Sequence, residues 1–363
     1  MSIQLTSLVI LAAIATDIVF SAPAIPDTNT LANDDCSLIS KLIDSKYPLT
    51  DPTVLPDGSV KFRIAIISDL DANSVSQEKA LTWVSYFKKG YLTYNKLAPK
   101  NISIEWDATN NGEEFKSNLA TSGRGLELSE LVTYNGNLIT LDDKTGLVYI
   151  IDENSLIPWV LVVDGNGKKT KGMKNEWATV KDSKIYVGSH GRELLAKDGQ
   201  TISDRGLMWV KTIDKSGSVQ HLNWTENFVK VRAAIDIHFP GYMTHEAVEW
   251  SDVHHRWFFL PRKASVDLYE PTADERKATN VLLSATANFD DIKVVRIGEI
   301  VPNHGYASFK FIPGTNHSVI TAISTQEEGD ITATFITAFT VDGEILLPET
   351  KVSDLKFEGF EFI

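Results

Sequence analysis

The chain has 363 residues, of which 43% are hydrophobic and 23% are charged, so it can bury a large core in one large domain or two ordinary ones. Its 48 Asp and Glu residues outnumber 35 Lys and Arg residues, giving a formal net charge of −13. A nucleic-acid surface requires clustered Lys and Arg that neutralise phosphates, so this balance excludes nucleic acid as a partner.

The first 22 residues are predicted to be a signal peptide. Residues 7–20 form an apolar stretch that is too short to span a bilayer and is interrupted by Asp17, and small residues follow it. Residues 23–57, rich in Pro, Asp and Asn, are predicted to be a lead-in to a single domain of residues 58–363. No later stretch is long and apolar enough to be an anchor, so we expect a secreted, extracellular protein without a membrane partner.

The single cysteine, Cys36, excludes an intramolecular disulfide. Three glycosylation sequons begin at Asn101, Asn223 and Asn316, and on a secreted route exposed sequons are glycosylated. We therefore expect a glycoprotein, and we expect it to be a monomer or a weak dimer.

From Val60 onward the sequence alternates between strands and turns. The segment KFRIAII is predicted to be a buried strand, and residues 129–152 to be three strands joined at Asn135-Gly136 and at Lys144-Thr145-Gly146. Residues 81–95 are predicted to be a hairpin with Gly90 in its turn. Short strands with turns every 8–12 residues or so are typical of an all-β sandwich, barrel or propeller.

A faint internal repeat favours the propeller. Similar strand–turn–strand segments recur at roughly the 40–50 residue span of a propeller blade, with two longer gaps. They begin at Glu130, Glu176, Glu246, Ala307 or Ser308, and Glu358. Five starts predict an all-β, five-bladed β-propeller. The last segment supplies one strand, so the N-terminal strands around KFRIAII are expected to complete its blade and close the ring.

Carboxylates at the starts of innermost strands would converge on the central channel. Unpaired, they would repel one another and raise their own pKa values, and a divalent cation would remove that cost. Carboxylate and carbonyl oxygens are the ligands that Ca²⁺ prefers. The repeat therefore predicts a central calcium site, with ordinary strand-edge surface residues as the alternative.

Several motifs together resemble the calcium-activated nucleotidase family, which includes salivary apyrases of blood-feeding arthropods and a vertebrate nucleotidase of the secretory pathway. They include SDLD, GRGLELSEL, DDKTGLVY, PGYMTHEAVEWSD, RWFFLPRKAS and KFEGFEFI, in order from about Val60 to Ile363. The resemblance implies a five-bladed propeller that hydrolyses nucleoside di- and triphosphates with Ca²⁺. It implies calcium ligands at Ser129, Glu130, Glu176, Glu246, Ala307, Ser308 and Glu358. A main-chain carbonyl of Ala307 would serve as well as that of the serine in the family pattern.

Two pairs of carboxylates are candidates for activating water, and each pair follows a strand where loops surround the channel. They are Asp69 with Asp71 in SDLD, and Asp142 with Asp143 in DDKTG. The alternative is that both pairs cap turns, a common role of Asp.

Phosphate binding requires basic side chains. Arg262 follows an apolar strand and is the first choice, because a guanidinium can grip phosphate with two parallel hydrogen bonds. Lys144, which replaces an arginine of the family pattern, Lys263 and Arg276 are further substrate-binding candidates. Trp177 is a candidate for stacking on a base, with a core position as the alternative.

Other catalytic signatures are excluded. Residues 164–172 are Gly-rich but lack the spacing of a phosphate-binding P-loop, His245 does not begin an HExxH zinc motif, and no GxSxG motif is present. The first hypothesis is a secreted, Ca²⁺-dependent apyrase that hydrolyses ATP and ADP to AMP. The resemblance to arthropod apyrases implies saliva as its source and inhibition of platelet aggregation as its role. The alternatives are a secretory-pathway diphosphatase preferring UDP or GDP, a calcium-stabilised propeller that binds a ligand without turnover, and a glycosidase.

Overall fold

The computed structural model describes residues 46–107 and 110–363. The predicted signal peptide, most of the predicted lead-in and Cys36 lie outside these residues. The described domain is built from five large antiparallel sheets and two small two-stranded ones, and in four of the large sheets the strands pair in chain order.

The first three of these sheets follow one another along the chain. The first contains β6 (Leu128–Tyr134), β7 (Asn137–Asp142), β8 (Leu147–Asp152) and β9 (Ser155–Leu161). The second contains β10 (Trp177–Lys181), β11 (Lys184–Gly188), β14 (Trp209–Ile213) and β15 (Val219–Asn223). The third contains β17 (Val248–Ser251), β18 (Arg256–Phe259), β20 (Val281–Thr286) and β21 (Ile292–Arg296).

The last two sheets bring the two ends of the domain together. The fourth contains β22 (His304–Phe311), β23 (Val319–Glu328), β24 (Ile331–Thr340) and β25 (Ile345–Ser353). The fifth combines the last strand, β26 (Phe357–Phe362), with β1 (Thr53–Val54), β2 (Val60–Ser68), β3 (Trp83–Tyr94), β4 (Ser103–Trp106) and β5 (Glu113–Ser117).

The remaining elements are short and lie between or beside the blades. They are β12 (Leu194–Leu195), β13 (Ile202–Asp204), β16 (Tyr242–Thr244), β19 (Lys263–Ser265), the helices α2 (Thr225–Ala233) and α3 (Pro271–Asp274), and the 3₁₀ turns η1 (Asp71–Ser74) and η2 (Gly206–Met208).

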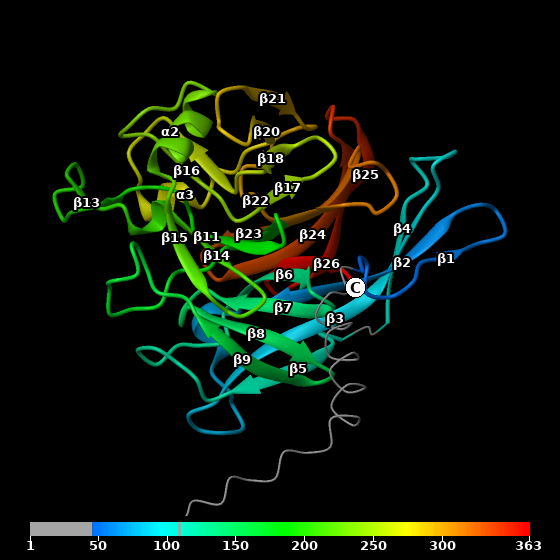
Figure 1. Cartoon of the computed structure of the whole chain (residues 1–363), viewed down its shortest axis with the longest axis horizontal. Coiled ribbons are helices and arrows are strands. Elements are labelled where there is room, and N and C mark those ends of the chain that lie inside the picture. The colour runs from blue at the N-terminus through cyan, green and yellow to red at the C-terminus, as the bar shows by residue number, and fades with distance from the viewer. Residues whose placement is uncertain (1–45, 108–109) are drawn as a thin grey trace, which may run out of the picture. The chain divides into compact units, whose positions relative to one another are not determined.

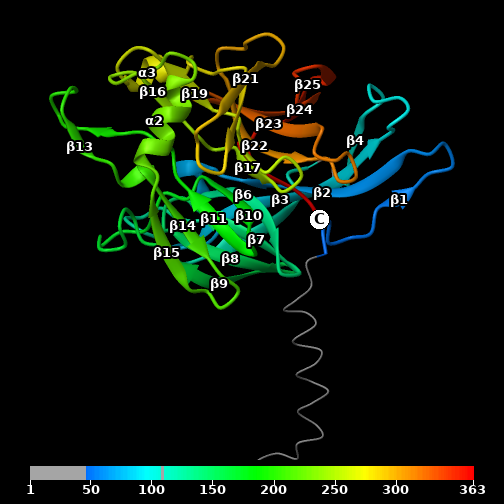
Figure 2. The same cartoon turned by 45° about the horizontal axis from the view of Figure 1, so that its top comes forward.

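The innermost strands form a ring. Contacts run from β6 to β10, β17, β22 and β26 in turn, and from β26 back to β6. Figures 1 and 2 show β9, β15, β21 and β25 toward the periphery of this arrangement. The predicted five-bladed β-propeller is therefore confirmed.

The ring closes as predicted, because β26 pairs antiparallel with β2 and supplies the innermost strand of the fifth blade. Its apolar side chains Phe357, Phe360 and Phe362 are fully buried. The ring of Phe362 packs edge-on against that of Phe62 on β2, with centroids 5.6 Å apart. Burying aromatic side chains of this size contributes roughly 1.5–3 kcal/mol each, so the last strand is an integral part of the core.

The turn at Asn135-Gly136 is confirmed, but the predicted hairpin at Gly90 is wrong. Asn135 and Gly136 have φ values of 52° and 75°, as a tight two-residue hairpin turn requires. In contrast, β3 runs unbroken through Gly90, which pairs with Trp106 of β4. A Cβ atom at Gly90 would lie 2.5 Å from the carbonyl oxygen of Glu105. The glycine therefore permits a close approach of two strands and does not form a turn.

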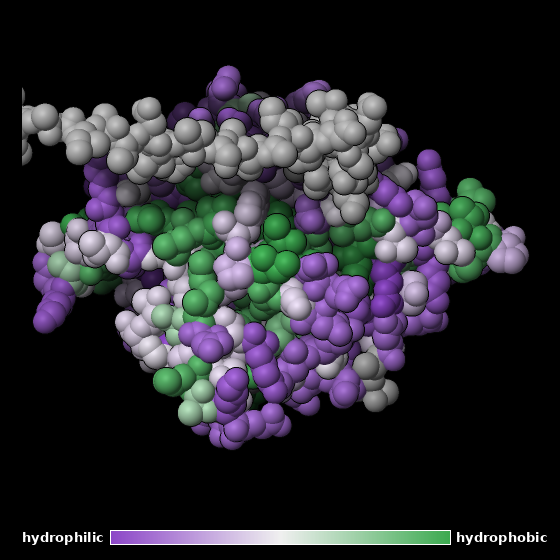
Figure 3. Space-filling model, turned by 60° about the horizontal axis from the view of Figure 1, so that its bottom comes forward, coloured by the Kyte–Doolittle hydropathy of each residue, from purple (hydrophilic) through white to green (hydrophobic). Residues whose placement is uncertain are grey.

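In the described part of the chain, no helix has the length and hydrophobicity needed to cross a membrane. Figure 3 shows one face of the domain, on which apolar side chains gather between hydrophilic ones. Apolar atoms contribute more than half of the surface of ordinary folded proteins, so this face by itself indicates no special partner.

Candidate functional site

Two cavities open at opposite ends of the channel between the innermost strands. The first mouth has a volume of about 180 Å³ and is lined by residues at the starts of innermost strands and at the ends of the strands beside them, such as Glu358 of β26 and Glu327 of β23. The second mouth has a volume of about 560 Å³ and is lined by the ends of the innermost strands and the turns that follow them, such as Thr133 and Asn135.

Arg262 lines the first mouth, directly before β19, and is only 4% exposed. Its Nη1 atom is 2.7 Å from Oε2 of Glu246 and 3.3 Å from Oε1 of Glu358, and its Nη2 atom donates a hydrogen bond to Glu327. Burial acts to lower the pKa of Arg262, but these three carboxylates raise it well above its usual value. Arg262 is therefore a buried permanent cation shared by carboxylates from three different blades.

Lys356 is a second buried cation of the first mouth. Its Nζ atom is 3.1 Å from Oδ2 of Asp69, 2.5 Å from Oδ2 of Asp71 and 3.2 Å from Oε1 of Glu327. Burial raises the pKa of Asp69 to about 7, although the attraction of Lys356 opposes this shift. Asp69 therefore has a pKa close to neutrality, which suits a group that exchanges protons with water.

The third group of the first mouth combines Glu176 and Glu246 with His190. The Nε2 atom of His190 is 2.9 Å from Oε1 of Glu176 and 3.1 Å from Oε1 of Glu246, and Lys174 also pairs with Glu176. Burial acts to raise the pKa of Glu176, but His190 and Lys174 together lower it below its usual range. Glu176 therefore remains ionised.

This donor set fits a divalent cation. One ligand atom each from Glu176, His190 and Glu246 lies within 4.8 Å of the others. Oε1 of Glu176 and Oε2 of Glu246 are buried and have ion-pair neighbours but no hydrogen bond. Eight Asp and Glu residues line the first mouth against five Lys and Arg residues, so the site has room for further positive charge. Because the donors are mainly carboxylate oxygens, they suit a hard cation such as Ca²⁺.

A second acidic cluster, formed by Asp69, Asp71 and Glu127, is already occupied by protein cations. Arg124 donates a 2.7 Å hydrogen bond to Glu127 and lies 3.1 Å from Asp71, and Lys356 bridges Asp71 and Asp69. The carboxylates around Glu176 and Glu246 are likewise paired with Lys174 and Arg262, so both clusters are shared with protein cations.

The predicted calcium ligands divide into two levels. Glu176, Glu246 and Glu358 line the first mouth, whereas Glu130 lies deeper, where its Oε1 accepts a 2.8 Å hydrogen bond from Ser308 and is 3.6 Å from Nζ of Lys310. Burial raises the pKa of Glu130 to about 8. Ser129 and Ala307 are buried beside this deeper level, and the hydroxyl of Ser129 has no hydrogen-bond partner.

The two predicted pairs of catalytic carboxylates lie in different surroundings. Asp69 and Asp71 line the first mouth. Asp142 instead holds the turn after β7, accepting hydrogen bonds from the backbone N–H groups of Lys144, Thr145 and Leu126. Asp143 pairs with Lys174, and burial raises its pKa to about 7, so it contacts the first mouth only through this lysine.

The predicted substrate-binding residues are also dispersed. Lys263 lines the first mouth, where burial and the neighbouring Arg262 lower its pKa to about 8. Lys144 lies on the DDKTG turn outside that lining, and Arg276 is exposed and pairs with Glu328. Trp177 is fully buried in the core, where its Nε1–H donates to the carbonyl of Ser189.

Several residues of the first mouth escaped the sequence analysis: Lys174, His190, Arg192, Tyr269, Glu327 and Lys356. Two of them carried a usable signal. Lys174 and Lys356 each stand two residues before a predicted ligand, Glu176 and Glu358, and residues two apart in extended chain face the same side. His190 follows β11 and Glu327 lies near the end of β23, the second strands of their blades. The repeated segments of the sequence could not be aligned at these positions.

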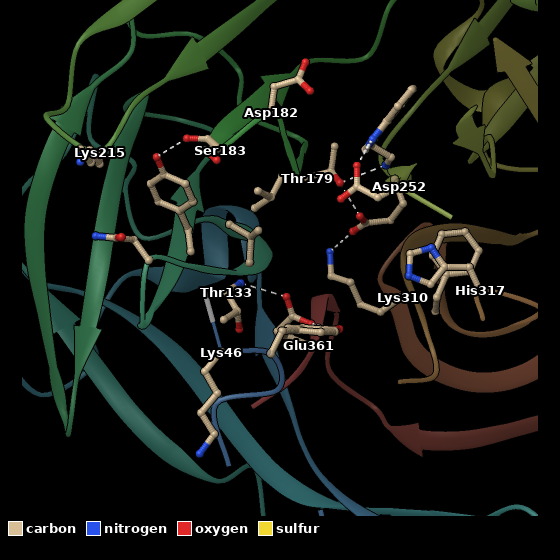
Figure 4. A pocket seen from close by; sticks show the side chains of 18 residues that line it. Lys46, Thr133, Thr179, Asp182, Ser183, Lys215, Asp252, Lys310, His317 and Glu361 are labelled. Atoms are coloured by element: carbon tan, nitrogen blue, oxygen red, sulfur yellow. Dashed lines mark hydrogen bonds and ion pairs between the residues drawn. The ribbon is translucent and has the colours of Figure 1, made fainter. Parts of the chain in front are cut away.

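At the second mouth, in contrast, the buried charged side chains have partners within the protein. Figure 4 shows Lys310 directed toward the carboxylates beside Thr179, with Glu361 beside Thr133. Lys310 pairs with Glu249, and Glu361 accepts a 3.0 Å hydrogen bond from the backbone N–H of Thr133 and a 2.9 Å hydrogen bond from the hydroxyl of Tyr47. These buried charges are thus satisfied within the protein.

The profile of the apyrase family matches residues 70–363. Two similar relatives are a soluble calcium-activated nucleotidase of Rattus norvegicus, 47% identical with 87% of this chain and 77% of that protein covered, and an apyrase of Cimex lectularius, 46% identical with 88% and 87% covered. An apyrase of Phlebotomus duboscqi is 36% identical, with 84% and 89% covered. The chain belongs to the apyrase family. Both the predicted family and the predicted enzyme class, a hydrolase of nucleotide phosphates, are thereby confirmed.

Proposed function

We propose that this protein is a secreted, Ca²⁺-dependent apyrase that converts ATP to ADP and ADP to AMP at the first mouth. The observation that carries this proposal is the meeting of Arg262, Lys356 and Asp69 beside a buried group of carboxylates. Hydrolysis of a phosphoanhydride needs charge neutralisation on the phosphates, a positioned water and in-line geometry. The first mouth offers side chains for the first two.

Each of these side chains has a chemical role in the proposal. Arg262 and Lys356 bind oxygens of the transferred phosphoryl group and stabilise the charge that develops on them. Asp69 orients a water molecule and accepts its proton as the oxygen attacks the terminal phosphorus, while the bond from phosphorus to the bridging oxygen breaks. Asp71, hydrogen-bonded through its backbone N–H to Asp69, holds that carboxylate in place.

Glu176, Glu246 and Glu358 would hold the calcium ion, which when bound neutralises phosphate oxygens. The deeper ligands Glu130 and Ser308, with Ser129 and Ala307 beside them, would extend the coordination toward the middle of the channel. The positive charge of the ion would offset the cost of burying the Glu130 carboxylate.

The setting of the enzyme is part of the proposal. We propose that residues 1–22 are removed as a signal peptide, that residues 23–57 lead into the catalytic domain of residues 58–363, and that the secreted protein is a glycosylated monomer or weak dimer. We also propose that the protein is a salivary apyrase that suppresses platelet aggregation by removing ADP, as the resemblance to arthropod apyrases implies; the similar protein of Cimex lectularius is an apyrase. N-terminal sequencing of the protein from a secreting host tests the cleavage.

The activity is tested by phosphate release from ADP, ATP, UDP and GDP with Ca²⁺, with Mg²⁺ and with chelator. We expect hydrolysis with Ca²⁺, its loss with chelator, and a fall in melting temperature on chelation. An ion at one hundred times its Kd stabilises the folded state by about 2.7 kcal/mol. Glu246→Gln should weaken this stabilisation, whereas Glu249→Gln at the second mouth should not. Equal hydrolysis in chelator would refute the dependence on calcium.

A further inference from the structure

An arginine and a tyrosine form a stacked pair in the lining of the first mouth. The guanidinium carbon of Arg192 lies 3.9 Å from the centroid of the Tyr269 ring, and both residues line the cavity that contains Arg262. The two side chains come from distant loops: Arg192 stands two residues after His190, and Tyr269 lies between β19 and α3. Both are half-buried, so part of the pair remains exposed at the mouth.

The pair is held in place from behind. The ring of Tyr269 packs edge-on against that of Tyr242, with centroids 5.2 Å apart and an interplanar angle of 77°. Tyr242 is itself fixed by its hydroxyl, which donates a 2.5 Å hydrogen bond to Oδ1 of Asp274. Arg192 donates from Nη1 to the carbonyl of Glu193 at 3.3 Å. A flat surface that is fixed before the ligand arrives costs little ordering entropy on binding.

The size of the cavity makes such a surface necessary. A volume of about 180 Å³ is below the roughly 300–1,000 Å³ that pockets for drug-sized molecules occupy. The first mouth can therefore enclose the phosphates of a nucleotide, while the nucleoside must rest on the rim. Among the described residues that line this mouth, Tyr269 is the one Phe, Tyr or Trp side chain. Trp177 is buried in the core, and Trp250 lines the second mouth.

We infer that Arg192 and Tyr269 form the nucleobase subsite, on whose exposed face the base stacks while the phosphates reach Arg262 and Lys356. This inference rests on the proposed nucleotide hydrolase. Arg guanidinium planes and aromatic rings both stack on bases, and such stacking tolerates any base because every base has a π-face. The subsite thus selects nucleotides over inorganic polyphosphate and discriminates only weakly among ADP, GDP and UDP.

The test compares a substrate that has a base with one that lacks it. Tyr269→Leu removes the π-face, and Arg192→Met removes its planar neighbour. Each should lower kcat/KM for ADP about 10-fold or more, mainly through KM, because stacking on one aromatic side chain typically changes binding by about 5- to 150-fold. Inorganic tripolyphosphate lacks a base. Its KM as a substrate, or its inhibition constant against ADP hydrolysis, should change less than about twofold in the same variants. Tyr269→Phe keeps the π-face and should show a smaller loss than Tyr269→Leu.

The chain offers a matched control. Tyr91 on β3 carries a similar stacked cation, with the guanidinium carbon of Arg63 at 4.6 Å, and lies outside the linings of both mouths. Tyr91→Leu should leave both KM for ADP and the constant for tripolyphosphate unchanged. Equal losses on both substrates, or no loss on ADP, would overturn the inference. If the wild-type protein hydrolyses no nucleotide, the proposed function fails, and calorimetric titration of these variants with ADP and tripolyphosphate decides the subsite separately.

Discussion

The two mouths of the channel contain buried charges of both signs, but they balance them differently. At the first mouth Arg262 and Lys356 are each shared among at least three carboxylates, and carboxylates remain in excess. At the second mouth Lys310 pairs with Glu249, and Glu361 is satisfied by neutral donors. The second cavity is about three times larger, yet the larger excess of carboxylates over basic side chains lies in the first. The proposed functional end of this channel is therefore chosen by its charge arrangement and not by cavity size.

The largest effect is expected from Arg262→Met. The variant should lose about a thousandfold or more of kcat/KM for ADP, since a single arginine that stabilises phosphoryl-transfer charge contributes roughly 10³–10⁵ in rate. It should also lose stability, because Glu246, Glu327 and Glu358 remain buried without their cation. Phosphate release and melting temperature measure the two effects.

Arg232→Met separates these two effects. Arg232 is equally buried and donates two hydrogen bonds, of 2.6 and 2.9 Å, to Glu193, but it lies outside the first mouth. This variant should lose stability by a similar amount while its folded fraction remains active. If both arginine variants reduce activity only in proportion to unfolding, Arg262 has no part in the reaction.

A smaller loss is expected from Asp69→Asn, which keeps the shape of the side chain and removes its basicity. We expect kcat for ADP to fall about 10²- to 10⁴-fold, the usual contribution of general acid–base catalysis. Because burial places the pKa of Asp69 at about 7, the carboxylate becomes more available as pH rises. The wild-type kcat/KM should therefore increase between pH 6 and pH 8, and the variant should lack this increase. An Asp142→Asn variant with the larger loss of kcat would favour the other pair of carboxylates.

The smallest effect concerns the second mouth and stability alone. Burial raises the pKa of Glu361 from 4.5 to about 7, so between these values the folded protein keeps a proton that the unfolded chain has released. Stability from this group is thus complete below pH 4.5 and is lost as pH rises through 7. Glu361→Gln should reduce the fall in melting temperature between pH 5 and pH 8 by a few degrees and leave ADP hydrolysis unchanged. Glu344→Gln, at an exposed position, is the control. If melting temperature falls equally with pH in the wild type and in both variants, Glu361 does not contribute to the pH dependence of stability.

The fold was predictable because its signals are local. Period-two alternation, the Asn135-Gly136 turn and the recurrence of Glu at strand starts each depend on a few neighbouring residues, and together they gave five blades. Gly90 was misassigned because a glycine that admits a neighbouring strand looks in sequence like a glycine that turns the chain. The decisive neighbour, Trp106, is distant in the sequence.

The candidate site was harder to predict from the sequence because its residues come from separate blades. Glu327 contacts Arg262 and Lys356, although it stands 65 residues from the first and belongs to no repeated position. The sequence also could not separate Asp142, which caps a turn, from Asp69, which faces the channel. That difference depends on which strand ends meet at the same mouth.

The closing strand has a consequence for biosynthesis. Lys356 lies 287 residues after Asp69, its partner across the joint between β26 and β2. During translation, the early strands of the fifth blade must wait, with one edge unpaired, until almost the whole domain has emerged from the ribosome. The same late segment carries Glu358 of the proposed calcium site, so partial chains have neither a closed ring nor the complete set of proposed acidic ligands. If the proposed site is the catalytic one, we expect unfinished chains inside the producing cell to hydrolyse no nucleotide.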